Sequence, residues 1–134
     1  MIDLSGKAAL VTGASKGIGF ATARLFAECG ASVMLSSRKQ ENLETAGTQM
    51  VGEFDLYAAN AGDPVQAEEC VARTIARFGG LDILVNNAGT SPYFGPLIDA
   101  DVVRFDKTMS VNLRGPLVWT QAAWRLAMKA RGAT

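Results

Sequence analysis

The stretch "TGASKGIG" (Thr12–Gly19) decides the fold, because it joins two segments with different hydrophobic periodicity. Before it, "AALVT" (Ala8–Thr12) is a continuous apolar run, which is typical of a strand buried on both faces of a sheet. After it, apolar side chains recur at helical spacing from Ile18 to Cys29, and Gly30 follows as a stop signal. The stretch is therefore predicted to be a tight connection between a buried strand and a helix.

The rest of the chain repeats this alternation. Further strands are predicted at residues 32–37, 54–59 and 81–85, and further helices at about 41–50, 64–78 and 101–129. Such alternation indicates a parallel sheet with helices on both faces, built by right-handed crossovers. We therefore expect residues 1–134 to form a single α/β domain of the Rossmann type, with strand order 3-2-1-4. Its ligand crevice should lie at the carboxyl ends of strands one and four.

The third predicted helix has a well-marked beginning and end. Asp63 is placed to cap it, Pro64 takes the first helical position, and Gln66 sits where a capping-box partner belongs. The pair Gly79-Gly80 is predicted to end the helix.

Composition excludes several kinds of chemistry. The net charge is zero, from 13 basic and 13 acidic side chains, which argues against nucleic acid or an anionic membrane as the main partner. The absence of histidine removes Ser-His-Asp and Cys-His nucleophile arrangements, and we expect no metal site. Cys29 and Cys70 are interpreted as buried reduced thiols. With no leader pattern and no membrane-length apolar run, a cytoplasmic location is expected.

A glycine-rich turn at the start of a helix suits a phosphate, because unpaired backbone N–H groups point out of the helix there. Gly13 would serve the turn, Gly17 the approach of a pyrophosphate, and Gly19 the packing of helix on strand. A plain strand–helix turn also favours glycine, but the position after the first buried strand favours a dinucleotide. The predicted contacts in this loop are Gly13, Ala14, Ser15, Lys16, Gly17, Ile18 and Gly19.

The glycine spacing and three further motifs resemble the N-terminal half of the short-chain dehydrogenase/reductase family. The motifs are "NNAG" (Asn86–Gly89), "DP" (Asp63-Pro64) and "SVNLRGP" (Ser110–Pro116), in the family's order and approximate spacing. The stretch "SPYFGPL" (Ser91–Leu97) looks nearest to the 3-oxoacyl reductase and carbonyl reductase branches. The resemblance implies an oxidoreductase that reduces a ketone or oxoacyl group of a small molecule with NADPH, or oxidises the corresponding alcohol.

The end of the second predicted strand favours NADP over NAD. In NAD-binding folds an acid about 20 residues past the glycine motif binds the ribose 2′-hydroxyl. This chain has Ser37 and Arg38 there, and the guanidinium is a suitable partner for a 2′-phosphate. Lys16 could reach the same group. Alternatively, both cations are ordinary solvated side chains.

The resemblance places further cofactor contacts after the third and fourth predicted strands. Asn60 stands where the family often has an aspartate that accepts a hydrogen bond from the adenine amino group, and the Asn60 side chain keeps a carbonyl acceptor. The backbone of Ala61 would line the same pocket. The segment Asn87, Ala88 and Gly89 would line the nicotinamide-ribose side, or brace the strands, or do both.

Of the family's catalytic set of Asn, Ser, Tyr and Lys, this sequence matches the asparagine with Asn112. Pro116, four residues later, has no N–H to donate to the Asn112 carbonyl, which would leave that carbonyl free for a proton relay. The other three members lie, in the family, on the fifth strand and the following helix. Neither Tyr57 nor Tyr93 is followed by a lysine four residues later.

The chain stops at Thr134, where a fifth strand is expected to begin, so we expect a truncated domain with no turnover on its own. Strand four would then have an open edge. Apolar groups of the last helix would be exposed or would pair with a second copy, namely Leu117, Trp119, Trp124, Leu126 and Met128. Two alternatives to an incomplete enzyme remain, a non-enzymatic dinucleotide-binding module and a non-functional fragment.

Overall fold

The computed structural model describes residues 2–131 and contains one parallel sheet. Its strands are β1 (Ala8–Thr12), β2 (Ser32–Ser37), β3 (Phe54–Ala58) and β4 (Ile83–Val85). They lie in the order β3-β2-β1-β4, so the predicted strand order is confirmed. In the register of the sheet, Leu10 at the centre of β1 pairs with Met34 on one side and Leu84 on the other. Within the described residues β4 pairs with β1 alone, which leaves its other edge open as expected.

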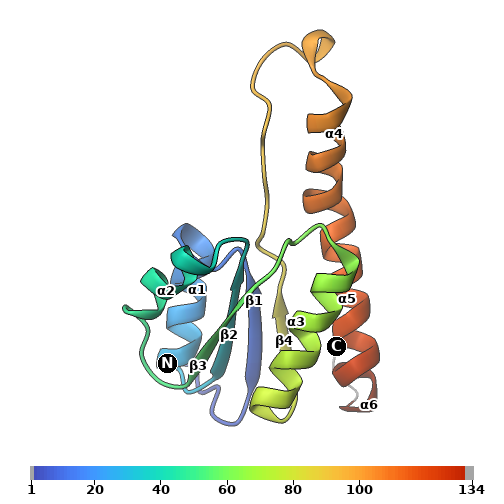
Figure 1. The fold of residues 1–134 in the computed structure, drawn as a ribbon. Coiled ribbons are helices and arrows are strands. Elements are labelled where there is room, and N and C mark those ends of the chain that lie inside the picture. Colours follow the sequence, from blue (N-terminus) through green and yellow to red (C-terminus); the bar gives the residue numbers. More distant parts are fainter. Residues whose placement is uncertain (1, 132–134) are drawn as a thin grey trace.

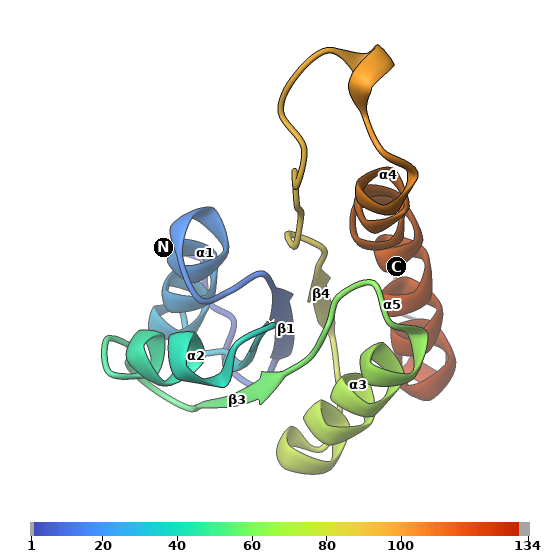
Figure 2. The same cartoon turned by 45° about the horizontal axis from the view of Figure 1, so that its top comes forward.

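Helices cover both faces of this sheet. Helices α1 (Gly17–Glu28) and α2 (Gln40–Gly47) lie on one face, and α3 (Pro64–Phe78) lies on the other (Figure 2). A long helix of consecutive segments runs beside α3, and its last segment ends near the lower end of the sheet in this view (Figure 1). These segments are α4 (Val102–Met109), the π-helix η2 (Ser110–Arg114), α5 (Gly115–Ala123), the π-helix η3 (Trp124–Met128) and α6 (Lys129–Arg131).

Two apolar layers explain why β1 reads as an unbroken apolar run. On the α1/α2 face, Val11 packs in one buried cluster with Leu35 and Leu43. On the α3/α5 face, its neighbour Leu10 packs in a second cluster with Trp119. Because successive side chains of a strand point to opposite faces, both positions must be apolar when both faces are covered.

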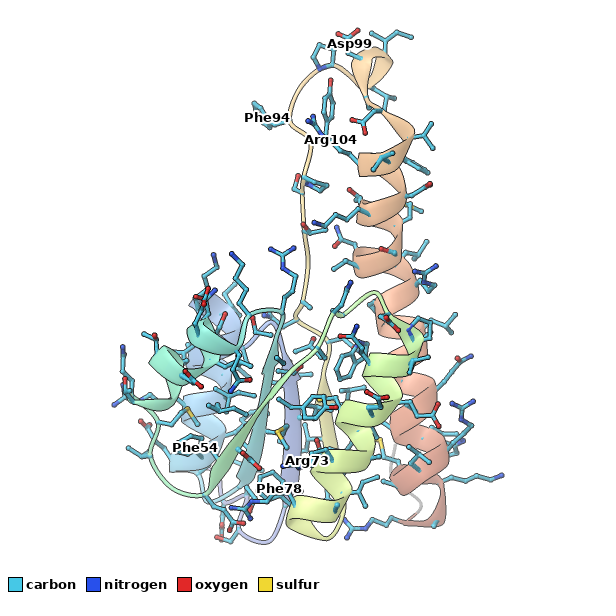
Figure 3. All side chains as sticks on the ribbon, in the orientation of Figure 1. Phe54, Arg73, Phe78, Phe94, Asp99 and Arg104 are labelled. Atoms are coloured by element: carbon cyan, nitrogen blue, oxygen red, sulfur yellow. The ribbon has the colours of Figure 1, made fainter. Side chains whose placement is uncertain are left out.

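The arm formed by the residues between β4 and α5 projects beyond the sheet (Figures 1 and 3). After β4 the chain runs out in extended form, passes through the 3₁₀ turn η1 (Leu97–Asp99) and returns as α4. Phe94 points away from the arm and is fully exposed. The arm is held together internally, because the Tyr93 hydroxyl donates to the Pro96 carbonyl at 2.6 Å and the Arg104 guanidinium lies over the Tyr93 ring.

Three sequence-based expectations about side chains are wrong. Trp119 is not exposed: only 1% of its surface is accessible, because it packs in one buried cluster with side chains of α3 and the sheet and donates its indole N–H to the Ala61 carbonyl. Gln66 forms no capping box with the Asp63 N–H, because its carbonyl accepts instead from the backbone N–H of Asn60. Cys29 is half-buried at the end of α1, whereas Cys70 is buried as expected.

Other expectations are confirmed with small shifts of boundary. The Asp63 carboxylate caps α3 by accepting from the N–H groups of Val65 and Gln66, and Gly79 ends the helix in the left-handed conformation. Exposure is confirmed for Leu117, Trp124 and Leu126, while Met128 packs partly against the core. The fourth strand is shorter than predicted because the Asp82 carboxylate accepts the Ala8 N–H that a strand carbonyl would otherwise accept.

Candidate functional site

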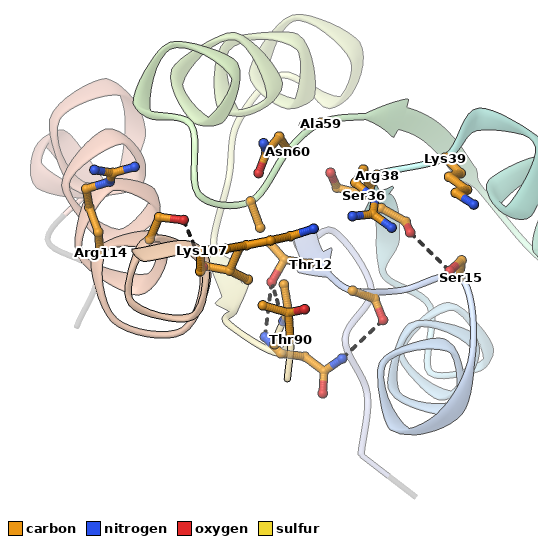
Figure 4. Close-up of a pocket in the computed structure, with 18 of the residues that line it drawn as sticks. Thr12, Ser15, Ser36, Arg38, Lys39, Ala59, Asn60, Thr90, Lys107 and Arg114 are labelled. Atoms are coloured by element: carbon orange, nitrogen blue, oxygen red, sulfur yellow. Dashed lines mark hydrogen bonds between the residues drawn. The ribbon is translucent and has the colours of Figure 1, made fainter. Parts of the chain in front are cut away.

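A cleft of about 1500 Å³ opens at the carboxyl ends of the strands, where the crevice was expected. Figure 4 shows its walls, which come from the glycine loop after β1, the end of β2, the residues after β3 and β4, and the long helix (Figure 4). The side chain of Lys107 extends from the long helix into the cleft. The Ser37 hydroxyl donates to the Ser15 hydroxyl at 3.0 Å and joins the end of β2 to the glycine loop.

The glycine loop has a shape that side chains at its key positions would prevent. Gly13 and Gly17 both have φ near the left-handed region, at 61° and 60°. A Cβ on Gly19 would overlap the Gly13 carbonyl oxygen and the Asn87 amide nitrogen. The α1 N-terminus that follows has no side-chain cap, whereas α3 and α4 are capped by aspartates. Its N–H groups are therefore available to an anion.

Thr12 ties the end of β1 to the end of its neighbour β4 at the cleft. Its hydroxyl accepts hydrogen bonds from the N–H groups of Asn87 and Ala88, each at 3.0 Å, and donates to the Val85 carbonyl at 3.3 Å. The Asn87 amide then donates to the Gly13 carbonyl at 3.1 Å. The sequence analysis did not single out Thr12 as a site residue, because it treated Thr12 as the last position of a strand. A hydroxyl side chain directly after a run of apolar residues could have indicated this role.

Asn112 braces the extended segment after β4. Its Oδ1 accepts from the Thr90 N–H at 2.7 Å, and its Nδ2 donates to the Thr90 carbonyl at 2.8 Å. These two bonds fix Thr90, which lines the cleft, whereas Asn112 itself is not among the lining residues. The π-helical turn η2 occurs here, just before Pro116, the residue that cannot donate to the Asn112 carbonyl.

Asn60 lies at the cleft and already uses part of its hydrogen-bonding capacity. Its Oδ1 accepts from the Gly62 N–H at 2.9 Å. A carbonyl oxygen has a second lone pair, so the side chain of Asn60 can still accept one hydrogen bond and can donate from its NH₂ group. The backbone around Ala61 is fixed by α5 through the Trp119 indole N–H, at 2.9 Å from the Ala61 carbonyl.

Most of the predicted contacts come together in this cleft. Twelve line it, namely Gly13, Ser15, Lys16, Gly17, Ile18, Ser37, Arg38, Asn60, Ala61, Asn87, Ala88 and Gly89. Ala14, Gly19 and Asn112 do not line it, and the first two are buried residues of the glycine loop itself. Lining residues that the sequence did not single out include Thr12, Lys39, Asn42, Thr90, Lys107 and Arg114.

The cleft concentrates positive charge in a chain of zero net charge. Lys16, Arg38, Lys39, Lys107 and Arg114 line it, and Asp106 is the one acid among the described residues that do. The cations come from both the β2 side and the long-helix side. A ligand with several negative charges would be attracted to this position.

Two other features are absent from the described part of the chain. Residues 2–131 contain no group of three or more Cys, Asp or Glu side chains arranged to hold a metal ion. In the same range, no helix has the length and apolar character needed to cross a membrane.

Comparison with known proteins gives concordant results. The profile of the short chain dehydrogenase family matches residues 7–134. The chain is 40% identical over 122 residues to human dehydrogenase/reductase SDR family member 4, covering 89% of this chain and 44% of the human protein. It is 37% identical over 131 residues to short chain dehydrogenase/reductase dpmpG of Macrophomina phaseolina (strain MS6), covering 95% of this chain and 75% of the fungal protein.

A solved structure of a metagenomic short-chain oxidoreductase in complex with NADP superposes with a TM-score of 0.90 at 35% identity, covering 97% of this chain and 60% of that one. The chain thus spans about half the length of the SDR family member 4 proteins that it matches. The glycine loop, the strand order and the family match agree, and the chain belongs to the short-chain dehydrogenase/reductase family.

Proposed function

We propose that this chain binds NADP(H) and forms the cofactor-binding part of a short-chain oxidoreductase. The observation that carries the choice of cofactor is the basic lining of the cleft, with five cations and a single acid. NADP has a diphosphate and a further phosphate on the adenosine ribose, so it gains more from such a lining than NAD. The metagenomic relative that superposes on this chain was solved with NADP.

The residues present fit the parts of such a ligand. The glycine loop, with its left-handed backbone at Gly13 and Gly17, leads directly into the uncapped N-terminus of α1, and this suits the diphosphate. Arg38 and Lys16 line the cleft, each directly after one of the two hydrogen-bonded serines, Ser37 and Ser15, and would hold the 2′-phosphate.

The remaining contacts would fix the two ends of the dinucleotide. Asn60 and Ala61 would hold the adenine, and Asn87, Ala88 and Gly89 the nicotinamide ribose. When bound, the nicotinamide supplies the hydride. Asn112 would orient the segment around Thr90 at the reacting end through its paired hydrogen bonds.

The reaction proposed for the full-length protein is reduction of a ketone or oxoacyl group of a small molecule, or oxidation of the corresponding alcohol. The proton donor of the family is a tyrosine paired with a lysine four residues later, and these 134 residues contain no such pair. We therefore propose that the chain as given, a single incomplete domain, binds cofactor without turnover. We further propose a cytoplasmic location, which the free thiols of Cys29 and Cys70 support. We also propose that copies of the chain associate through the exposed side chains of Leu117, Trp124 and Leu126.

Thermal unfolding with NADPH and with NADH, followed by a reductase assay with ketone substrates, tests this proposal. Ligand that binds only the folded chain raises the unfolding temperature, so NADPH should give a larger shift than NADH at equal concentration. A shift without NADPH consumption fits the incomplete enzyme and also a non-enzymatic binding module. No shift with either nucleotide would contradict the proposal and favour a non-functional fragment, and turnover would contradict the claim that this chain is inactive alone.

A further inference from the structure

The loop that enters α3 is held by side chains of the long helix. The Arg114 guanidinium donates twice to the Gly62 carbonyl, from Nη2 at 3.0 Å and from Nε at 3.3 Å. Five residues further along the helix, the Trp119 indole N–H donates to the preceding carbonyl, that of Ala61, at 2.9 Å. Two consecutive peptide carbonyls of the loop are therefore fixed from a helix that follows them by about fifty residues in the sequence.

The fixed peptide in turn sets the conformation of Asn60. The Gly62 N–H donates to Asn60 Oδ1 at 2.9 Å, so the carboxamide of Asn60 is oriented by the residue whose carbonyl Arg114 holds. The position is tightly packed, because a Cβ on Gly62 would lie 2.9 Å from the Ser110 hydroxyl oxygen. A continuous chain of contacts thus runs from Arg114 through Gly62 to Asn60 at the edge of the cleft.

One helix serves both walls of the cleft at the π-helical turn η2. Asn112 holds the Thr90 backbone after β4, while Arg114, two residues later, holds the Gly62 backbone after β3. Residues two apart on a helix point in nearly opposite directions, so these two side chains diverge toward different loops. The spacing of the walls is therefore set by side chains two positions apart.

Resting on the proposed NADP function, we propose that Arg114 is a positioning residue for the adenosine half of the dinucleotide. It acts by holding the segment 60–62 in its binding conformation before the ligand arrives. Preorganisation of this kind raises affinity because the loop need not be ordered at the moment of binding. Arg114 also lines the cleft, so a direct attraction between its charge and a phosphate is the competing explanation.

Affinity measurements on the full chain can separate the two explanations. The variants are Arg114→Met, which removes bonds and charge, and Arg114→Lys, which keeps the charge but loses the two-bond fork. Arg125→Met is the matched control, because Arg125 is exposed on the same helix and does not line the cleft. The probes are NADPH, 2′,5′-ADP as the adenosine half, and inorganic pyrophosphate as a charge without adenosine.

We expect Arg114→Met to weaken 2′,5′-ADP binding by about five- to tenfold, with Arg114→Lys restoring only part of the loss. The loss should persist in about 0.5 M salt, where screening removes most of a direct charge effect. Pyrophosphate binding should change no more than in Arg125→Met. Full rescue by lysine, or disappearance of the loss in salt, would overturn the positioning role.

Hydrogen exchange without ligand provides a second readout that does not depend on binding. The amides of Asn60 and Gly62 should exchange faster in Arg114→Lys and Arg114→Met than in Arg125→Met, and equal rates would overturn the inference. If Arg114→Met does not fold, Arg114→Lys carries both comparisons. Failure of the unaltered chain to bind NADPH would refute the proposed function instead, so the two failures are distinguishable.

Discussion

The hydroxyl of Thr12 accepts the backbone N–H of Asn87 at 3.0 Å and so joins the carboxyl ends of β1 and β4 at the cleft. Thr12 is only 2% exposed, and the same oxygen also accepts the Ala88 N–H. The polypeptide turns away from the sheet at this point in both strands. One side-chain oxygen therefore helps to hold the ends of β1 and β4 together beside the cleft.

Replacing Thr12 with valine should destabilise the fold and weaken nucleotide binding. Valine keeps the shape but leaves the Ala88 N–H without its acceptor, while the Asn87 N–H keeps its second acceptor, the Val85 carbonyl at 3.1 Å. Leaving a buried donor unsatisfied costs roughly 1–3 kcal/mol, so we expect the free energy of unfolding to fall by about 1–3 kcal/mol in urea titrations. Thr12→Ser, which keeps the oxygen, should lose less than half as much. Equal losses in both variants would show that packing of the methyl group, and not the hydrogen bonds, determines the stability.

A methyl group at Gly19 should be far more damaging than one at Gly47. At Gly19 the added carbon overlaps the Gly13 carbonyl and the Asn87 amide, so α1 would have to move away from β1 and distort the glycine loop. At Gly47 the nearest atoms lie 3.4 Å away in the side chains of Phe54 and Leu56. We expect Gly19→Ala to abolish detectable NADPH binding and Gly47→Ala to preserve it, as measured by calorimetry. Retained binding in Gly19→Ala would be inconsistent with this geometry.

The stability of the chain should depend on Asp82 in acid. Burial opposes its ionisation, but hydrogen bonds from the Ala8 N–H and from Arg131 outweigh burial and lower the pKa of Asp82. A pKa that is lower in the folded state contributes stability above the unfolded value near 3.9, and this contribution is lost as the pH falls through the folded value. Asp82→Asn should therefore cost about 1–2 kcal/mol at pH 7, and its difference from the unaltered chain should shrink below about pH 4.

Asp99→Asn is the control for Asp82, because Asp99 is exposed at the tip of the arm. Denaturant titrations across the acid range would record both variants. An Asp82→Asn difference that stays constant between neutral and acid pH would contradict the assigned role of the carboxylate.

The two thiols should differ in reactivity. Burial raises the pKa of the Cys70 thiol to about 12, and the residue has no accessible surface, whereas Cys29 is partly exposed. Because the thiolate is the reactive form, a thiol reagent at about pH 8 should label one cysteine quickly, and Cys29→Ser should remove that phase. Cys70 should react only upon unfolding. Because its folded pKa is raised, its contribution to stability should be lost as the pH rises above about 8.5, and Cys70→Ala should flatten that slope.

The arrangement of strands and helices was predictable because each buried face requires apolar side chains at a regular spacing in the sequence. The run Ala8–Val11 is apolar throughout because α1 and α3 cover opposite faces of the sheet, and Gly79 ends α3 because its backbone is left-handed. What could not be predicted depends on contacts between distant segments. The burial of Trp119 follows from its packing against α3 and from an acceptor at Ala61, and neither is visible in the local pattern of the last helix.

The residues of the candidate site likewise fall into those that the sequence identifies and those that depend on contacts between distant segments. The glycine loop, Arg38 and Asn87 were identified from their positions after predicted strands, because strand ends of a parallel sheet meet at one edge. Lys107 and Arg114 were not identified, since their approach to the cleft depends on how the long helix crosses the sheet. The paired bonds of Asn112 to Thr90 likewise depend on the extended course of the arm after β4.

The central claim is that Arg38 and Lys16 give the cleft its preference for a phosphorylated adenosine ribose. Titration calorimetry of NADPH and NADH into the unaltered chain and into the double variant Lys16→Ala/Arg38→Ala tests it most directly, with Lys7→Ala/Lys129→Ala as a control that removes two cations outside the cleft. We predict at least about tenfold tighter binding of NADPH than of NADH in the unaltered chain and in the control, and a preference below about threefold in the double variant. An unchanged preference in the double variant, or no binding of either nucleotide to the folded chain, would contradict the claim.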